Sequence, residues 1–226
     1  HMATVTAISI QKKWGNSKSY ANAIGGLIGQ IVGVNCQVHG CKNSGEVDTY
    51  SSGAQGSFQI GGIVGALEGR LSSIQWSENS GKVTGHTQIG GILGRTVIAD
   101  GNISIRNCIN KGDIIATGSI AGGLVGTALA YTFSCNIQNN VNTASVTAPE
   151  SSGSLMGYAQ GNVKFDLNYM TNNGKVMMGG KVSLSGYSPS GNTNCIFFYD
   201  YRITPGTAEI CGTDQYILSM IIDDLR

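Results

Sequence analysis

The sequence contains little proline and few charged residues, and it has no long run of apolar residues. Only 3 of the 226 residues are proline, 12% are charged, and the net charge is +1. The clustered lysine and arginine typical of proteins that bind nucleic acid or membrane surfaces are therefore missing. Disordered glycine-rich chains usually carry proline and lack the 41% apolar content found here. These features indicate a folded chain, and no segment reaches the length of a transmembrane helix.

Glycine, by contrast, is abundant, with 34 residues, and much of it recurs in one short pattern. Five segments follow the order Gly-Gly-aliphatic-aliphatic-Gly, the last in a degenerate form. They are GGLIG from Gly25, GGIVG from Gly61, GGILG from Gly90, GGLVG from Gly122 and GSLMG from Gly153. Their spacings of 36, 29, 32 and 31 residues are typical of a solenoid, in which each repeat forms one coil.

A second pattern keeps the same spacing. Each copy has an asparagine, then glycine or alanine two residues later, then valine or isoleucine two residues further on. The asparagines are Asn43, Asn79, Asn110, Asn142 and Asn172. In stacked coils these residues would lie above one another and could pass side-chain amide hydrogen bonds along the row. We therefore predict a structural ladder of asparagines.

Short alternating stretches lie upstream of each asparagine, as in SSIQWS from Ser72 and ISIRNC from Ile103. A period of two is typical of strands. With the glycine pentad and the segment after each asparagine, they predict three strands per coil. The predicted fold is all-β: a parallel β-helix, or β-solenoid, of about five three-strand coils, spanning residues 20–186. Residues 1–19 are expected to form a leading cap strand.

The C-terminal residues 187–226 break the repeat and are expected to form a cap. In TDQYILSMIIDDLR, Ile217, Met220, Ile221 and Leu225 have the spacing of one helix face, which predicts a short helix. The cap is expected to cover the open edge of the last coil, because exposed strand edges promote aggregation.

The two aliphatic residues of each pentad are adjacent, so in an extended strand they would point to opposite faces. One row would enter the core and the other would face solvent. A contiguous exposed apolar strip usually marks an interaction site. The sequence therefore predicts a candidate partner-contact row, made of Leu27, Ile63, Ile92, Leu124 and Leu155.

The pentads resemble the GLUG motif, a Gly-Gly-aliphatic-aliphatic-Gly repeat of large secreted or surface-anchored bacterial proteins, found near immunoglobulin A-cleaving peptidases and in gut bacterial surface proteins. The resemblance is carried by residues 25–29, 61–65, 90–94, 122–126 and 153–157, and NCIFFYDYR from Asn194 resembles the segment that closes such arrays. It covers roughly residues 20–202. It implies a surface β-solenoid that serves as a spacer, stalk or binding surface. No His-Glu-x-x-His zinc motif occurs, so peptidase activity is not implied.

The six cysteines are not expected to form a disulfide framework. Cys41 and Cys108 share one repeat position two coils apart, roughly 9.6 Å at the spacing of paired strands, which is too far for a bridge. Cys36 and Cys135 likewise share a position three coils apart, so all four are expected to be small buried residues. A bridge between Cys195 and Cys211, outside the repeat, stays open.

No catalytic, cofactor-binding or metal-binding residues are predicted. His39 lies beside Cys41, but its repeat position is otherwise occupied by Gln75, Arg106, Gln138 and Asn168, so we expect a solvent-facing strand residue. The carboxylates Glu46 and Asp113 share a position with Lys82 between them, which indicates a mixed charged face rather than a catalytic pair.

We therefore expect a non-catalytic repeat domain of a secreted or cell-surface protein, acting in adhesion or as a structural stalk, without a cofactor. The expected partners are a host or cell-surface protein, a glycan, and neighbouring domains of a larger chain. Nucleic acid binding and membrane insertion are not expected. The sequence leaves open two alternatives: a carbohydrate-active β-helix enzyme and a glycan-binding module.

Overall fold

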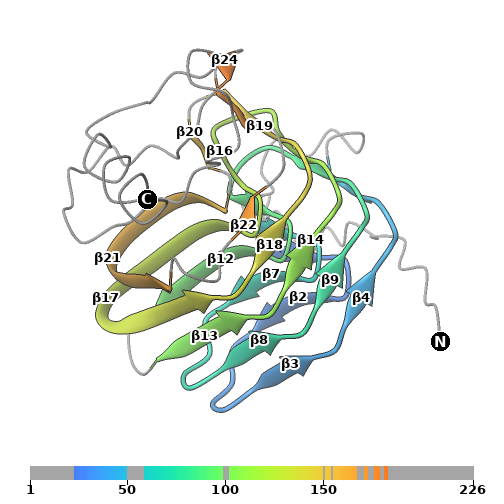
Figure 1. Ribbon diagram of the computed structural model, residues 1–226. Coiled ribbons are helices and arrows are strands. Elements are labelled where there is room, and N and C mark those ends of the chain that lie inside the picture. Colours follow the sequence, from blue (N-terminus) through green and yellow to red (C-terminus); the bar gives the residue numbers. More distant parts are fainter. Residues whose placement is uncertain are drawn as a thin grey trace, which may run out of the picture.

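The structure, a computed structural model, describes residues 23–49, 59–98, 102–149, 151–153, 155–166, 171–172, 176–178 and 181–182. This part of the chain is a parallel β-solenoid in which successive coils stack on one another (Figure 1). The described segments contain strands, turns and bends but no helix. Accordingly, this part has no helix of the length and hydrophobicity needed to cross a membrane.

Coils 1 to 3 each contain five short strands, and coils 4 and 5 cover the same five positions with four strands. Coil 1 has β1 (Ala23–Gly25), β2 (Ile28–Ile31), β3 (Gln37–His39), β4 (Lys42–Asn43) and β5 (Val47–Asp48). Coil 2 has β6 (Gln59–Gly61), β7 (Val64–Leu67), β8 (Ser73–Gln75), β9 (Glu78–Asn79) and β10 (Val83–Gly85). Coil 3 has β11 (Ile89–Gly90), β12 (Leu93–Ile98), β13 (Ile103–Arg106), β14 (Ile109–Asn110) and β15 (Ile114–Ala116).

In coils 4 and 5 one long strand spans the second and third positions. Coil 4 has β16 (Ile120–Gly122), β17 (Val125–Gln138), β18 (Val141–Asn142) and β19 (Val146–Ala148). Coil 5 has β20 (Ser151–Gly153), β21 (Met156–Asp166), β22 (Thr171–Asn172) and β23 (Val176–Met178). A last strand, β24 (Lys181–Val182), pairs antiparallel with β23.

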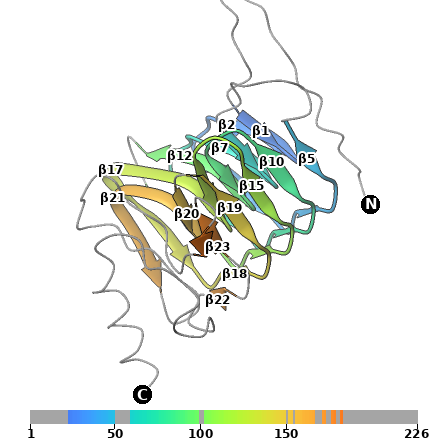
Figure 2. The ribbon, with the colours of Figure 1, turned by 90° about the horizontal axis from the view of Figure 1, so that it is seen from above.

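Equivalent strands of successive coils pair in parallel and form four sheets (Figure 2). The first strands pair in the order β1-β6-β11-β16-β20, the fourth in the order β4-β9-β14-β18-β22, and the fifth in the order β5-β10-β15-β19-β23. The second and third strands belong to one sheet, because β17 pairs with both β12 and β13. The sequence prediction of a parallel β-solenoid is thus confirmed.

The number of strands per coil differs from the prediction of three. The second glycine and the first aliphatic residue of each complete pentad lie in a bend rather than in a strand. The pentad therefore contributes the end of one strand and the start of the next, as at β6 and β7. The asparagine turn divides the following segment in the same way, which gives β9 and β10 in coil 2.

The prediction that one aliphatic row of the pentads faces outward is wrong. Ile63, Ile92, Leu124 and Leu155 are fully buried, and Leu27 packs against the same core from the first coil. The strict alternation of side chains holds only for extended chain. Because the pentad is bent, both of its aliphatic residues enter the core, and in coils 2 to 5 this row offers no surface to a partner.

The core is divided into two hydrophobic clusters that run along the stack. In coil 2, Ile60 and Val83 belong to the smaller cluster, between the first and fifth strands. Val64 and Ile74 belong to the larger cluster, between the second and third strands. Each coil thus passes from one cluster to the other and back.

The chain of each coil passes between the two clusters twice, once at the glycine pair and once at the asparagine. These two segments lie close together and form a narrow part of the cross-section, here called the waist. A Cβ on Gly62 would lie 2.6 Å from Asn79 Oδ1 and would overlap the carbonyl oxygen of Gly91 in the next coil. Gly26 and Gly91 have the same relation to Asn43 and Asn110. The second glycine of the first three pentads is therefore required by close approach of the asparagine, so the two sequence patterns are parts of one structure.

The predicted caps lie outside the described residues. This applies to the leading strand at residues 1–19, to the C-terminal cap at residues 187–226 with its helix, and to Cys195 and Cys211.

Candidate functional site

The asparagines at the waist form a continuous hydrogen-bonded ladder. Asn43 Nδ2 donates to Asn79 Oδ1 at 2.9 Å, Asn79 Nδ2 to Asn110 Oδ1 at 2.9 Å, and Asn110 Nδ2 to Asn142 Oδ1 at 2.9 Å. Each of these four side chains is at most 1% exposed. The fifth predicted member, Asn172, pairs with Asn142 through the backbone register of β18 and β22.

Each amide in the ladder also closes the turn of its own coil. The Nδ2 atoms of Asn43, Asn79 and Asn110 donate to the carbonyl oxygens two residues later, at 2.8 to 2.9 Å. Asn142 makes the same bond to Ala144, at 2.9 Å. Both hydrogens of the amide are therefore used, one within the coil and one between coils. A buried amide satisfied in this way stabilises the turn and fixes the register of the stack.

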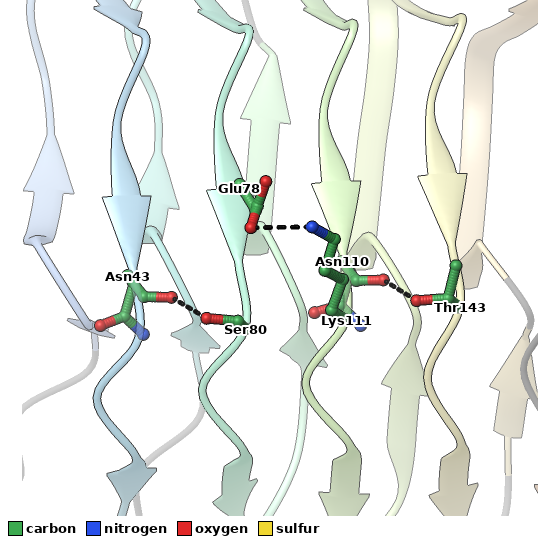
Figure 3. A network of polar contacts seen from close by, with 6 residues as sticks. All are labelled: Asn43, Glu78, Ser80, Asn110, Lys111 and Thr143. Atoms are coloured by element: carbon green, nitrogen blue, oxygen red, sulfur yellow. Dashed lines mark hydrogen bonds and ion pairs between the residues drawn. The ribbon is translucent and has the colours of Figure 1, made fainter.

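The residue after each asparagine adds a second link on the outside of the turn (Figure 3). The Ser80 hydroxyl donates to the carbonyl oxygen of Asn43, and the Thr143 hydroxyl donates to that of Asn110, both at 3.3 Å. The equivalent residue of coil 3, Lys111, forms an ion pair with Glu78 at 3.0 Å. These contacts link neighbouring coils only, as expected for a solenoid.

The charged row beside the turns is a mixed, solvated face. Lys82 forms an ion pair with Glu46 at 3.2 Å, and both side chains are about half exposed. The other carboxylate of the row, Asp113, accepts a hydrogen bond from the backbone N–H of Ser145 at 3.0 Å. Opposite charges thus alternate along the stack, and the two carboxylates do not face one another.

The thiols differ in burial according to their coil. Cys108 and Cys135 are fully buried, whereas Cys36 and Cys41 in the first coil are only partly buried, because a coil stacks on one side of them. All four are free cysteines. Burial raises the pKa of Cys108 to about 11 and that of Cys135 to about 12. These two thiols are therefore protonated and unreactive at neutral pH.

His39 and Cys41 do not form a nucleophile and base pair. The Cys41 thiol donates to the backbone carbonyl of His39 at 3.6 Å rather than to its imidazole. His39 is exposed and pairs in register with Gln75, which pairs in turn with Arg106. The prediction of a solvent-facing strand residue is confirmed. Among the described residues, no three His, Cys, Asp or Glu side chains come together as metal ligands.

The outward side chains of the third strands form a second feature, here called the polar face. Along these strands Val38, Ile74, Ile105 and Ile137 point into the core, so their neighbours point outward. The residues of the polar face are Gln37, His39, Ser73, Gln75, Ser104, Arg106, Asn136 and Gln138. They lie on β3, β8, β13 and the C-terminal half of β17, which run side by side in Figure 1.

A sharp corner with left-handed backbone follows each of these third strands. The corner residues and their φ angles are Gly40 (65°), Trp76 (53°), Asn107 (56°) and Asn139 (51°). Glycine and asparagine adopt this conformation readily, but a bulky side chain does so at a cost of about 1–2 kcal/mol. Trp76 is nevertheless held there, and its side chain is 59% exposed.

Leu71, at the opposite end of β8, is likewise a bulky, exposed residue in left-handed backbone. It has a φ of 52° and is 59% exposed, whereas the equivalent residue of coil 1 is Asn35, with a φ of 57°. Neither Trp76 nor Leu71 was predicted from the sequence as a functional residue. The signal was present in the repeat, because Trp76 lies three residues before Asn79 just as Gly40 lies three residues before Asn43.

The geometry defines a parallel β-solenoid with an internal asparagine ladder, and comparison with known proteins adds one relative. No family model matches the sequence, and no solved structure matches it. The chain is similar to halomucin of Haloquadratum walsbyi, with 28% identity over 132 residues. The matched region is 56% of this chain but 1% of halomucin, so the chain spans only a small part of that protein's length.

Proposed function

We propose that this chain is a non-catalytic repeat domain of a secreted or cell-surface protein, and that it acts as a structural stalk that also takes part in adhesion. The observation that carries the proposal is the continuous ladder from Asn43 to Asn142. It fixes each coil to the next with buried hydrogen bonds, which produces a stiff element whose length depends on the number of coils.

The similarity to halomucin supports the surface assignment. The fold and this match together are compatible with a structural repeat domain of a surface protein, since the relative is a mucin by name. Adhesion, the finer part of the proposal, is supported by Leu71 and Trp76 in coil 2. Both are bulky, exposed and held in left-handed backbone, and strained backbone of this kind clusters at functional sites. The GLUG resemblance of the pentads agrees with this proposal.

The surface assignment is tested by labelling intact cells that produce the full-length protein with an antibody raised against this chain. We expect labelling without permeabilisation. Labelling that requires permeabilisation would contradict the proposal. In parallel, the purified chain is incubated with plant and bacterial polysaccharides, and new reducing ends are measured. Turnover of any of them would favour the alternative of a carbohydrate-active enzyme.

A further inference from the structure

We propose that the polar face around Trp76 binds a glycan chain, with the indole ring of Trp76 stacked on the apolar face of one sugar ring. This inference deepens the proposed function, since it names the ligand class through which a surface domain of this kind would adhere. The observation that carries it is the position of Trp76, a bulky residue in a left-handed corner that coils 1, 3 and 4 fill with glycine or asparagine.

The position of Trp76 has no evident structural purpose. Its side chain is 59% exposed, so the ring contributes little to the core. Its backbone N–H donates to the carbonyl oxygen of Arg106 at 3.2 Å, a bond that any residue other than proline could make. Strained backbone at an exposed aromatic residue is typical of functional sites. The ring is therefore retained for a contact outside the coil.

The neighbours of Trp76 along the corner row leave room for a flat ligand. On one side lies Gly40, which has no side chain and whose Cβ position is open. On the other side lies Asn107, whose Oδ1 accepts a hydrogen bond from Asn139 Nδ2. The aromatic platform is thus bordered by open space and by a pair of amides.

The chemistry of the polar face suits sugar hydroxyl groups. Gln75, Gln138 and Asn107 offer amide groups that both donate and accept, and Arg106 offers fixed donors. A sugar ring presents hydroxyls at its rim and C–H groups on its face, which match amides and an aromatic ring, respectively. Arg106 pairs in register with Gln75 on one side and Gln138 on the other, and the carboxylate of this row, Asp166, follows only in coil 5. A sugar with a carboxylate group is therefore also accommodated beside Arg106.

A protein partner fits this surface less well. The exposed large apolar residues of the described chain are Val32, Val34, Leu71 and Trp76. The first three lie before the third strands, at the opposite end of β8 from Trp76, and Val34 is bridged to Arg70 in the next coil. Trp76 is thus an isolated aromatic residue among amides rather than the centre of an apolar patch of the kind that protein interfaces bury.

The test uses the whole chain on a printed array of neutral and uronic-acid-containing oligosaccharides of four to six sugars. The strongest binders are then titrated by isothermal calorimetry against wild type, Trp76→Asn and Leu71→Asn. Both substitutions place asparagine, which tolerates the left-handed corner, so both should fold. We expect the melting temperature of each to be unchanged or raised by about 2–4 °C.

Trp76→Asn is expected to lower glycan affinity at least tenfold, while Leu71→Asn stays within twofold of wild type. Binding that is unaffected by Trp76→Asn overturns the proposal. Failure of the wild-type chain to bind any oligosaccharide also overturns it. Neither result bears on the surface labelling of intact cells, so failure of this inference and failure of the proposed function are distinguishable.

Discussion

At the scale of single residues, the ladder requires a side chain that is short, donates twice and accepts at least once. Asparagine meets these conditions, because one Nδ2 hydrogen of Asn79 reaches Gly81 and the other reaches Asn110, while Oδ1 accepts from Asn43. Aspartate has the same shape but, when ionised, no donor. Shape and hydrogen bonding can therefore be separated experimentally at this position.

We predict that Asn79→Asp lowers the free energy of unfolding by about 3 kcal/mol or more at pH 7. The ionised carboxylate would be buried against the carbonyl oxygen of Gly81 and Oδ1 of Asn110, with two donors lost. These neighbours raise the carboxyl pKa in the folded state above its unfolded value of about 3.9. Stability is therefore present below about pH 4 and lost as the pH rises through the folded-state pKa.

Urea titrations of Asn79→Asp at pH 3 and pH 7 measure this effect. The matched control is Ser80→Ala, which removes one weak hydrogen bond to the carbonyl oxygen of Asn43 from an exposed residue and should cost at most about 1 kcal/mol, equally at either pH. Equal losses for Asn79→Asp at the two pH values would contradict the role assigned to the donors.

At the scale of elements, the glycine pentad forms a bend, and its first two glycines are required there for different reasons. Its first glycine lies against backbone on two sides. A Cβ on Gly61 would overlap the carbonyl oxygen of Val64, three residues later, and would lie 2.9 Å from the nitrogen of Gly94 in the next coil. Its second glycine faces the asparagine ladder. The same bend turns two adjacent aliphatic residues inward, as Ile63 and Val64 show.

This bend explains which part of the element pattern could not be predicted from the sequence. The parallel stacking and the asparagine row follow from the repeat, because equivalent residues of a solenoid lie above one another. The number of strands per coil does not, because the bends divide segments that were predicted as single strands. The direction of Ile63 and its equivalents does not follow, because the alternation rule assumes extended chain. Only the contact of Gly62 with Asn79, which joins two distant segments of one coil, shows that the chain must bend there.

We predict that Gly62→Ala destabilises the protein by at least about 3 kcal/mol, since the added methyl group would overlap backbone and the buried Asn79 amide. Thermal unfolding followed by circular dichroism is the measurement. Gly40→Asn is the control, because its Cβ position is open and asparagine occupies that corner in coils 3 and 4. A melting temperature of Gly62→Ala close to that of the control would show that the waist can widen.

At the scale of the whole molecule, the repeat predicts contacts between coils but not the cross-section within a coil. The row of Glu46, Lys82 and Asp113 and the alignment of His39 with Gln75 were readable from spacing alone. The division of the core into two clusters was not, because it depends on which strands of one coil face each other. The repeat aligns Trp76 with Gly40, but the left-handed backbone and the exposure of this position were visible only once the corner had been placed in space.

The two buried thiols make the free energy of unfolding depend on pH in the alkaline range. The pKa values of Cys108 and Cys135 are raised by burial, from an ordinary value of 9.0 to about 11 and about 12. Above pH 9 the unfolded chain loses these two protons while the folded chain keeps them. The stabilisation is therefore complete below pH 9 and is lost as the pH rises towards the folded-state values.

We predict that the free energy of unfolding falls between pH 9 and pH 11 by up to about 1.4 kcal/mol per pH unit for each of the two thiols. Urea titrations across this range, under reducing conditions, measure the slope. Tyrosine and lysine residues also titrate in this range, so the slope is compared with that of the double variant Cys108→Ser, Cys135→Val. Serine occupies the position of Cys108 in coil 2 as Ser77, where its hydroxyl donates to the carbonyl oxygen of Gln75 at 3.0 Å.

Valine is equally suited to the position of Cys135, because the residue paired with it in β13 is Ile103, which is buried in the same cluster. Both substitutions therefore preserve the packing of the stack and remove only the titrating groups. The stability of the variant should fall less steeply with pH than that of the wild type. The two proteins should have similar stability at pH 8, and the wild type should be the less stable of the two at pH 11. Identical slopes would show that the two thiols open to solvent without unfolding of the coils around them.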